Sequence, residues 1–268
     1  MSAAAARAAV RGTAGPWDET AAALARRGYA VVRGLVHPDA VRELRAASDA
    51  LLAPVPFDTT GTLQIVQPSR IAPAFASLLR DERLFAPARA ALGAARIQLL
   101  QEVLLCKGGS ADARIPWHRD ATWFGYLRPL RALSMRIALA PCGIGSGGLV
   151  VIAGSHLWAG AARPDAGGAT RVVDALAAEP AERRAQARRQ RVRVDLRPGD
   201  VSLHAAGTLH ASGPNREPHL RPTLVLHLFD GACTLDPARL PPGTTAANFP
   251  TDARGRLDAA AFPVLSRA

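Results

Sequence analysis

The chain has 268 residues, of which 49% are hydrophobic and 21% charged, an ordinary balance for one globular domain with a sizeable core. It contains no run of about 18 to 20 apolar residues, which excludes a helical membrane span. The N-terminal residues lack an apolar stretch of the secretory type, so we expect no secretory signal. The three cysteines are an odd number without a CxxC pair. They argue against a disulfide scaffold or a thiolate zinc site and suit a reducing cytoplasm.

The formal net charge of +11 invites a nucleic-acid interpretation. Nearly all of the positive charge is arginine, because Lys107 is the single lysine. The densest basic cluster, residues 182–191, has no interleaved aromatic residues on which bases could stack. Nucleic acid is therefore an unlikely partner, and an anionic small molecule is a comparably modest possibility.

The first third of the chain is predicted to be mostly helical. Residues 18–27 favour a helix and residues 29–35 a short strand. A second helix begins at Asp39, with apolar residues at three- and four-residue spacing. Residues 54–70 are rich in proline and predict a loop with one strand at 63–66, and a third helix runs from Pro73 to about Leu92.

After Gly93 the pattern changes to short apolar runs separated by glycine and proline, which predicts a β-sandwich or barrel. The expected strands are residues 97–105, 133–139, 148–152, 192–196, 200–204 and 223–229. Residues 161–191 form a polar, helical insertion, residues 1–16 a flexible arm, and residues 235–268 an extended C-terminal segment. No repeat or linker is visible, so residues 1–268 are predicted to form a single domain.

The most informative motif is Trp117-His118-Arg119-Asp120. In a β-strand, His118 and Asp120 would point the same way, because side chains alternate with a period of two. Two histidines and one carboxylate on one face of an iron ion are typical of non-haem Fe(II) oxygenases. The second histidine must come from elsewhere. His210 precedes Ser-Gly-Pro-Asn, where a strand would end, whereas His204 lies inside an apolar strand and is the main alternative.

Several further motifs accompany this pair. They are Gly154-Ser155-His156, Pro198-Gly199-Asp200, His210-Ala211-Ser212-Gly213-Pro214-Asn215, and Arg221 eleven residues after His210. Together with Trp117-His118-Arg119-Asp120, they make residues 29–229 resemble the phytanoyl-CoA dioxygenase family of Fe(II)- and 2-oxoglutarate-dependent oxygenases. The resemblance implies a mostly β fold with flanking helices, in which the core is a double-stranded β-helix, or jelly roll.

By this resemblance, His118, Asp120 and His210 are the catalytic iron ligands, and Arg221 binds the distal carboxylate of the cosubstrate 2-oxoglutarate. A planar, permanently charged guanidinium suits a carboxylate, and imidazole with carboxylate suits Fe(II). The resemblance also implies that Ser212, Gln101 and Lys107 are candidates for binding the cosubstrate. Phe124 is the candidate for the substrate pocket.

The implied activity is the O₂-dependent oxidation of an unactivated C–H bond in a small molecule. The expected reaction is hydroxylation of a secondary metabolite or an amino-acid-like compound. Desaturation and ring formation stay open, whereas related halogenases lack the carboxylate that Asp120 supplies here. Two alternatives are a nucleic-acid-modifying oxygenase and a jelly-roll binding protein without activity. The sequence identifies neither the substrate nor the oligomeric state.

Overall fold

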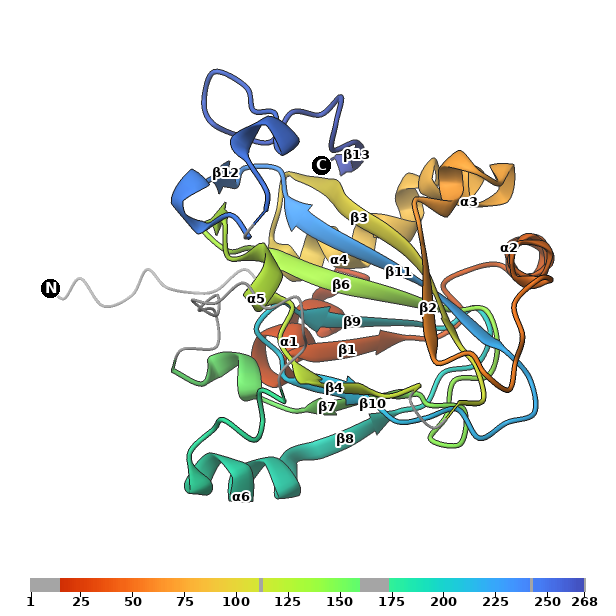
Figure 1. Cartoon of the computed structure of the whole chain (residues 1–268). Helices are drawn as coiled ribbons and strands as arrows, with labels where there is room; N and C mark the ends of the chain where they lie inside the picture. The colour runs from red at the N-terminus through yellow and green to blue at the C-terminus, as the bar shows by residue number, and fades with distance from the viewer. Residues whose placement is uncertain (1–14, 111–112, 160–173, 242, 268) are drawn as a thin grey trace, which may run out of the picture.

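The computed structural model describes residues 15–110, 113–159, 174–241 and 243–267. Two antiparallel sheets face each other across the interior (Figure 1). The large sheet has the strand order β1-β9-β6-β11-β3-β13, with β2 also paired to β3, and the small sheet has the order β4-β10-β7-β8. This arrangement confirms the predicted mostly β, jelly-roll core with flanking helices. The predicted N-terminal arm lies almost wholly outside the described residues.

The strands occupy the following segments of the chain. Those of the large sheet are β1 (Tyr29–Val32), β2 (Thr62–Val66), β3 (Arg96–Lys107), β6 (Ala132–Ala138), β9 (Val201–Ala205), β11 (Arg221–Asp230) and β13 (Val264–Arg267). Those of the small sheet are β4 (Ile115–His118), β7 (Leu149–Ile152), β8 (Arg191–Val194) and β10 (His210–Ser212), and β5 (Leu127–Arg128) pairs with β12 (Thr234–Leu235).

The α-helices lie mainly on the outer face of the large sheet (Figure 1). They are α1 (Asp18–Arg27), α2 (Pro38–Leu52), α3 (Pro73–Leu79) and α4 (Ala86–Leu92), together with α5 (Ala121–Phe124) and α6 (Ala181–Gln190) elsewhere. Alternation along β6 shows how this packing positions the interior. Leu133, Met135 and Ile137 are buried in the main hydrophobic core, whereas Ser134 and Arg136 line a pocket between the sheets.

Two predicted segments differ in the structure. The single helix expected over residues 73–92 is divided into α3, a 3₁₀ turn at Glu82–Phe85, and α4. Asp81 causes the division, because its side chain accepts a hydrogen bond from the backbone N–H of Arg83 and starts a new turn. The C-terminal segment is not simply extended. It contains two 3₁₀ turns and ends in β13, which pairs with β3.

The predicted insertion at residues 161–191 lies partly outside the described residues. Its described part contains α6, whose residues are mostly exposed, and then leads directly into β8. All three cysteines are free and buried. Within the described segments, no helix combines the length and apolarity needed to traverse a bilayer.

The turn before β9 is stabilised by the nearly buried Asp200. Its carboxylate accepts hydrogen bonds from the backbone N–H groups of Gly34 and Arg197 and from the Arg33 guanidinium, at 2.7 to 2.9 Å. Burial alone would raise the pKa of Asp200, but these donors outweigh it and lower the pKa below its ordinary value. The carboxylate therefore ties the segment after β1 to the start of β9.

We expect Asp200→Asn to lower the free energy of unfolding by about 1–3 kcal/mol at pH 7, because an amide cannot accept all three bonds. Since the folded-state pKa is depressed, the stabilisation is present above the unfolded-state pKa near 3.9 and is lost as the pH falls through the folded-state pKa. The difference between the two proteins should therefore shrink by pH 3 in urea unfolding. Asp195→Asn is the matched control, because the Asp195 carboxylate has no hydrogen bond to the described residues. An equal loss in both variants would contradict this account.

Candidate active site

Three side chains that are distant in the sequence meet at one end of the small sheet. His118 is the last residue of β4, Asp120 immediately precedes α5, and His210 is the first residue of β10. His118 and His210 are register partners on adjacent strands. One ligand atom from each of the three lies within 4.8 Å of the others. The structure thus brings together the three residues that the sequence singled out as metal ligands.

The local geometry differs from the prediction in two details. Asp120 lies beyond the end of β4 and has helical backbone angles, so the pair does not share one strand face. The turn into α5 directs its carboxylate back toward His118. His210 begins a strand and does not end one. The three ligand atoms converge nevertheless, because β4 and β10 are antiparallel neighbours.

Backbone carbonyls orient both imidazoles. Nδ1 of His118 lies 2.7 Å from the carbonyl oxygen of Pro116, and Nδ1 of His210 lies 3.0 Å from that of Thr208. Since a carbonyl only accepts, each Nδ1 carries the proton and each Nε2 keeps its lone pair. The Nε2 atoms lie 3.8 and 3.6 Å, respectively, from the same carboxylate oxygen, Oδ1 of Asp120. This is the orientation that metal-binding histidines adopt.

The other carboxylate oxygen of Asp120 is held by protein donors. Oδ2 accepts hydrogen bonds from the Ser134 hydroxyl and from Nε2 of His204, the latter at 3.1 Å. The Ser134 oxygen in turn lies 2.8 Å from Nδ1 of His227, from which it accepts. His204 is therefore a donor to the carboxylate, and in the described residues it does not belong to the group able to hold a metal.

The charge states suit a metal ion. Burial, followed by the neighbouring His118 and His204, lowers the pKa of His210 well below its usual range, and burial also lowers the pKa of His118. Burial opposes ionisation of Asp120, but His210 and the hydrogen bond from His204 hold the pKa of this carboxyl well below its usual range. Two neutral imidazoles and one carboxylate are a fitting donor set for ferrous iron.

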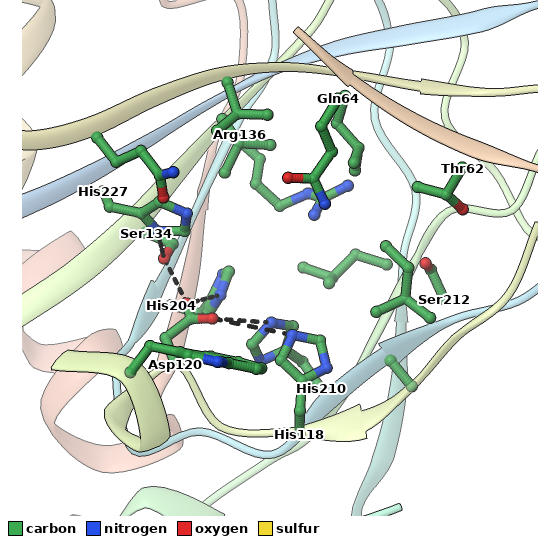
Figure 2. Close-up of a pocket in the computed structure, with 18 of the residues that line it drawn as sticks. Thr62, Gln64, His118, Asp120, Ser134, Arg136, His204, His210, Ser212 and His227 are labelled. Carbon is green, nitrogen blue, oxygen red and sulfur yellow. Dashed lines mark hydrogen bonds and ion pairs between the residues drawn. The ribbon is translucent and has the colours of Figure 1, made fainter. Parts of the chain in front are cut away.

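These ligands open into a cavity of about 420 Å³ between the two sheets (Figure 2). This volume lies within the range of small-molecule sites. Figure 2 shows His118 and His210 on one side of the pocket and Arg136 and Gln64 on the other. The remaining wall combines aromatic, aliphatic and polar side chains, including Trp123, Phe124, Val103, Val225, Thr62 and Gln101.

Three of the other predicted site residues line this cavity. The Ser212 hydroxyl is buried and has no hydrogen-bond partner in the described structure. Gln101 also lines the pocket, where it is exposed. Phe124 is buried and its ring meets that of His227 edge to face, with centroids 4.9 Å apart. Their roles toward cosubstrate and substrate stay predictions.

Two predicted residues are not among those that line the cavity. Arg221 is fully buried, and its guanidinium donates to the carbonyl oxygens of Ser146 and Gly147 and to the Thr223 hydroxyl. The Lys107 ammonium donates to the carbonyl oxygens of Ala113 and Gly213. Both cations thus have backbone partners in the structure.

The sequence reasoning did not single out Ser134, Arg136 or His227, which all line the cavity. Burial lowers the pKa of His227 to about 4, so this imidazole is neutral at ordinary pH. The only available signal was the alternation along β6, because polar residues at 134 and 136 interrupt an otherwise apolar strand. His227 lies beside Ser134 in the strand register.

Comparison with known proteins agrees with this geometry. The family model described as phytanoyl-CoA dioxygenase matches residues 24–223. The chain belongs to the phytanoyl-CoA dioxygenase family.

Among curated relatives, an ectoine dioxygenase from Streptomyces coelicolor is 31% identical over 148 residues, which is 50% of this chain and 49% of that protein. The chain thus matches about half the length of this relative. Among solved structures, EctD from S. alaskensis with 2-oxoglutarate and 5-hydroxyectoine is 26% identical to this chain. The match covers 93% of this chain and 84% of the EctD chain, with a TM-score of 0.64. The carbocyclase SnoK from nogalamycin biosynthesis has a TM-score of 0.71 at 22% identity. The match covers 92% of this chain and 95% of the SnoK chain, and it shows the shared fold.

We expect Ser134→Ala to weaken Fe(II) or Ni(II) affinity by about 10- to 100-fold, because it removes a donor that orients the ligating carboxylate. Isothermal titration of the purified protein with Ni(II) measures this. Ser110→Ala, outside the cavity lining, is the control and should keep the wild-type affinity. Unchanged affinity in Ser134→Ala would show that the hydroxyl does not position Asp120.

Proposed function

We propose that this chain is an Fe(II)- and 2-oxoglutarate-dependent oxygenase that oxidises an unactivated C–H bond of a small molecule. The observation that carries the proposal is the arrangement at the cavity wall. Two Nε2 lone pairs and one carboxylate oxygen face one another, while every other polar atom of these side chains is bonded to protein. Three protein ligands on one side leave coordination positions for other molecules.

Each protein group has a distinct task in this proposal. His118, Asp120 and His210 hold ferrous iron, which supplies O₂ activation coupled to the decarboxylation of 2-oxoglutarate to succinate and CO₂. Ser134 and His204 fix the carboxylate so that only Oδ1 faces the two imidazoles. Trp123 and Phe124 restrict water beside the ligands, which protects the reaction from solvent.

The cavity supports a compact substrate with polar and apolar parts. The cavity is lined by aromatic rings and also by the amides of Gln64 and Gln101 and the Thr62 hydroxyl. We propose a secondary metabolite or an amino-acid-like compound, which fits the cavity volume of about 420 Å³. Among the similar proteins, those named for ectoine support this substrate class.

The activity is tested by succinate formation from 2-oxoglutarate with Fe(II), O₂ and a panel of such small molecules. We expect iron-dependent turnover in the wild type and background levels in His118→Ala and Asp120→Ala, because each variant lacks one of three protein ligands. His219→Ala is the control, since this histidine is exposed and outside the cavity lining. Full turnover in either ligand variant would refute the proposed metal site.

A further inference from the structure

Arg119 lies between the proposed ligands His118 and Asp120 but is not among the residues that line the cavity. Its side chain is buried. Its Nε donates a hydrogen bond to the backbone carbonyl oxygen of Gly207 over 3.1 Å, and its Nη2 donates to Oε1 of Glu179 over 2.8 Å. The guanidinium therefore joins two parts of the chain that are distant from it in the sequence.

Gly207 belongs to the turn that precedes the third proposed ligand, His210. The next residue, Thr208, supplies the carbonyl oxygen that orients the His210 imidazole. The hydrogen bond from Arg119 therefore connects the turn between β4 and α5 to the turn between β9 and β10. Two of the proposed ligands lie beside the first turn, and the third lies at the end of the second.

The second partner of Arg119 comes from the polar insertion, just before α6. The Glu179 side chain is only 10% exposed. Its Oε1 accepts from Arg119, and its Oε2 accepts from Nη1 of Arg183 over 3.0 Å. The carbonyl oxygen of Glu179 accepts a further bond from Arg184 on α6. Because both carboxylate oxygens take part in charge-assisted bonds, Glu179 holds the Arg119 guanidinium in one position.

The insertion also contacts the ligand-bearing segment at other points. The backbone N–H of Ala175 donates to the carbonyl oxygen of Trp117 over 2.7 Å. The two guanidinium groups that bind Glu179 lie over the Trp158 ring, at 5.9 and 5.6 Å from its centre. Both tryptophans pack against a buried apolar cluster that contains Leu209. The described part of the insertion is therefore packed directly against the chain that carries the proposed ligands.

We propose that Arg119 is a positioning residue of the metal site. Held by Glu179, it fixes the turn between β4 and α5 against the turn between β9 and β10, and so sets the spacing of the ligands that these turns carry. This inference rests on the proposed function, because the spacing matters only if the three side chains bind a metal ion. It also gives the insertion a task, since residue 179 supplies the carboxylate on which the arrangement depends.

The test compares metal binding in the wild type and in Arg119→Met, which removes both bonds and keeps a long side chain. We expect the Ni(II) affinity in isothermal titration to fall about 10- to 100-fold, because the metal must then order the two turns itself. The visible absorption of the Co(II)-loaded protein, which depends on ligand geometry, should change as well. In the metal-free variant, hydrogen exchange should become faster at the N–H of Ala121, which donates to the carbonyl oxygen of Ala206 across the two turns.

Two matched variants separate positioning from stability. Arg183→Gln removes the other partner of Glu179 and has no hydrogen bond to either turn in the described structure. Its melting temperature should fall, while its Ni(II) affinity and Co(II) spectrum stay those of the wild type. Arg119→Lys keeps a cation for Glu179 but lacks the Nε–H that binds Gly207. Its melting temperature should be close to that of the wild type, while its Ni(II) affinity stays reduced.

Equal Ni(II) affinities and equal Co(II) spectra in the wild type and Arg119→Met would overturn the inference. An equal loss of affinity in Arg183→Gln would also overturn it, because metal binding would then follow the general stability of the insertion. If Arg119→Met does not fold, Arg119→Lys decides by the same two measurements. A wild type that binds neither Ni(II) nor Co(II) would instead refute the proposed metal site.

Discussion

The two carboxylate oxygens of Asp120 have different partners, and the geometry of the whole site depends on this difference. Oδ2 is bound by Ser134 on β6 and His204 on β9, which are strands of the large sheet. Oδ1 faces His118 and His210 on the small sheet. One carboxylate thus joins the two sheets at the level of the proposed metal. Because its position depends on both sheets, the ligand geometry depends on how they pack against each other.

The same register that orients Asp120 also shapes the pocket. On β6, the residues at 133, 135 and 137 are buried in the core beneath the helices, so those at 134 and 136 must face the other sheet. A shift of one residue would move Ser134 and Arg136 into the hydrophobic core and place three apolar side chains in the cavity. The burial of the apolar face therefore specifies which polar groups enter the cavity. The alternation of apolar and polar side chains along β6 therefore sets both the core packing and the chemistry of the site.

The sequence predicted most strands of the large sheet, and β7 and β8 of the small sheet, because their apolar runs are bounded by glycine and proline. The short strands β10 and β13 were not among the expected strands. It also singled out the three residues that the structure brings together, since one residue separates His118 from Asp120 and His210 precedes a recognisable turn. The partners of Asp120 could not be predicted in this way. Ser134 and His204 become its donors only through the pairing of β6 with β9, which no local pattern encodes. The third predicted helix is divided because of a local interaction of Asp81. The apolar periodicity alone predicted one continuous helix there.

Electrostatics distinguishes the three buried cations beside the cavity. Burial, with Arg221 and Arg136 nearby, lowers the pKa of Lys107 to about 7, so this ammonium is readily neutralised. The Arg221 guanidinium donates to backbone carbonyl oxygens, whose dipoles solvate it. Arg136 has neither option, since a guanidinium does not deprotonate at neutral pH and no described protein group accepts its N–H bonds. The positive charge that an incoming molecule meets in the interior is therefore concentrated on Arg136. A neutral molecule would leave that charge unpaired, so a carboxylate gains more than any neutral group of the same size by occupying this part of the cavity.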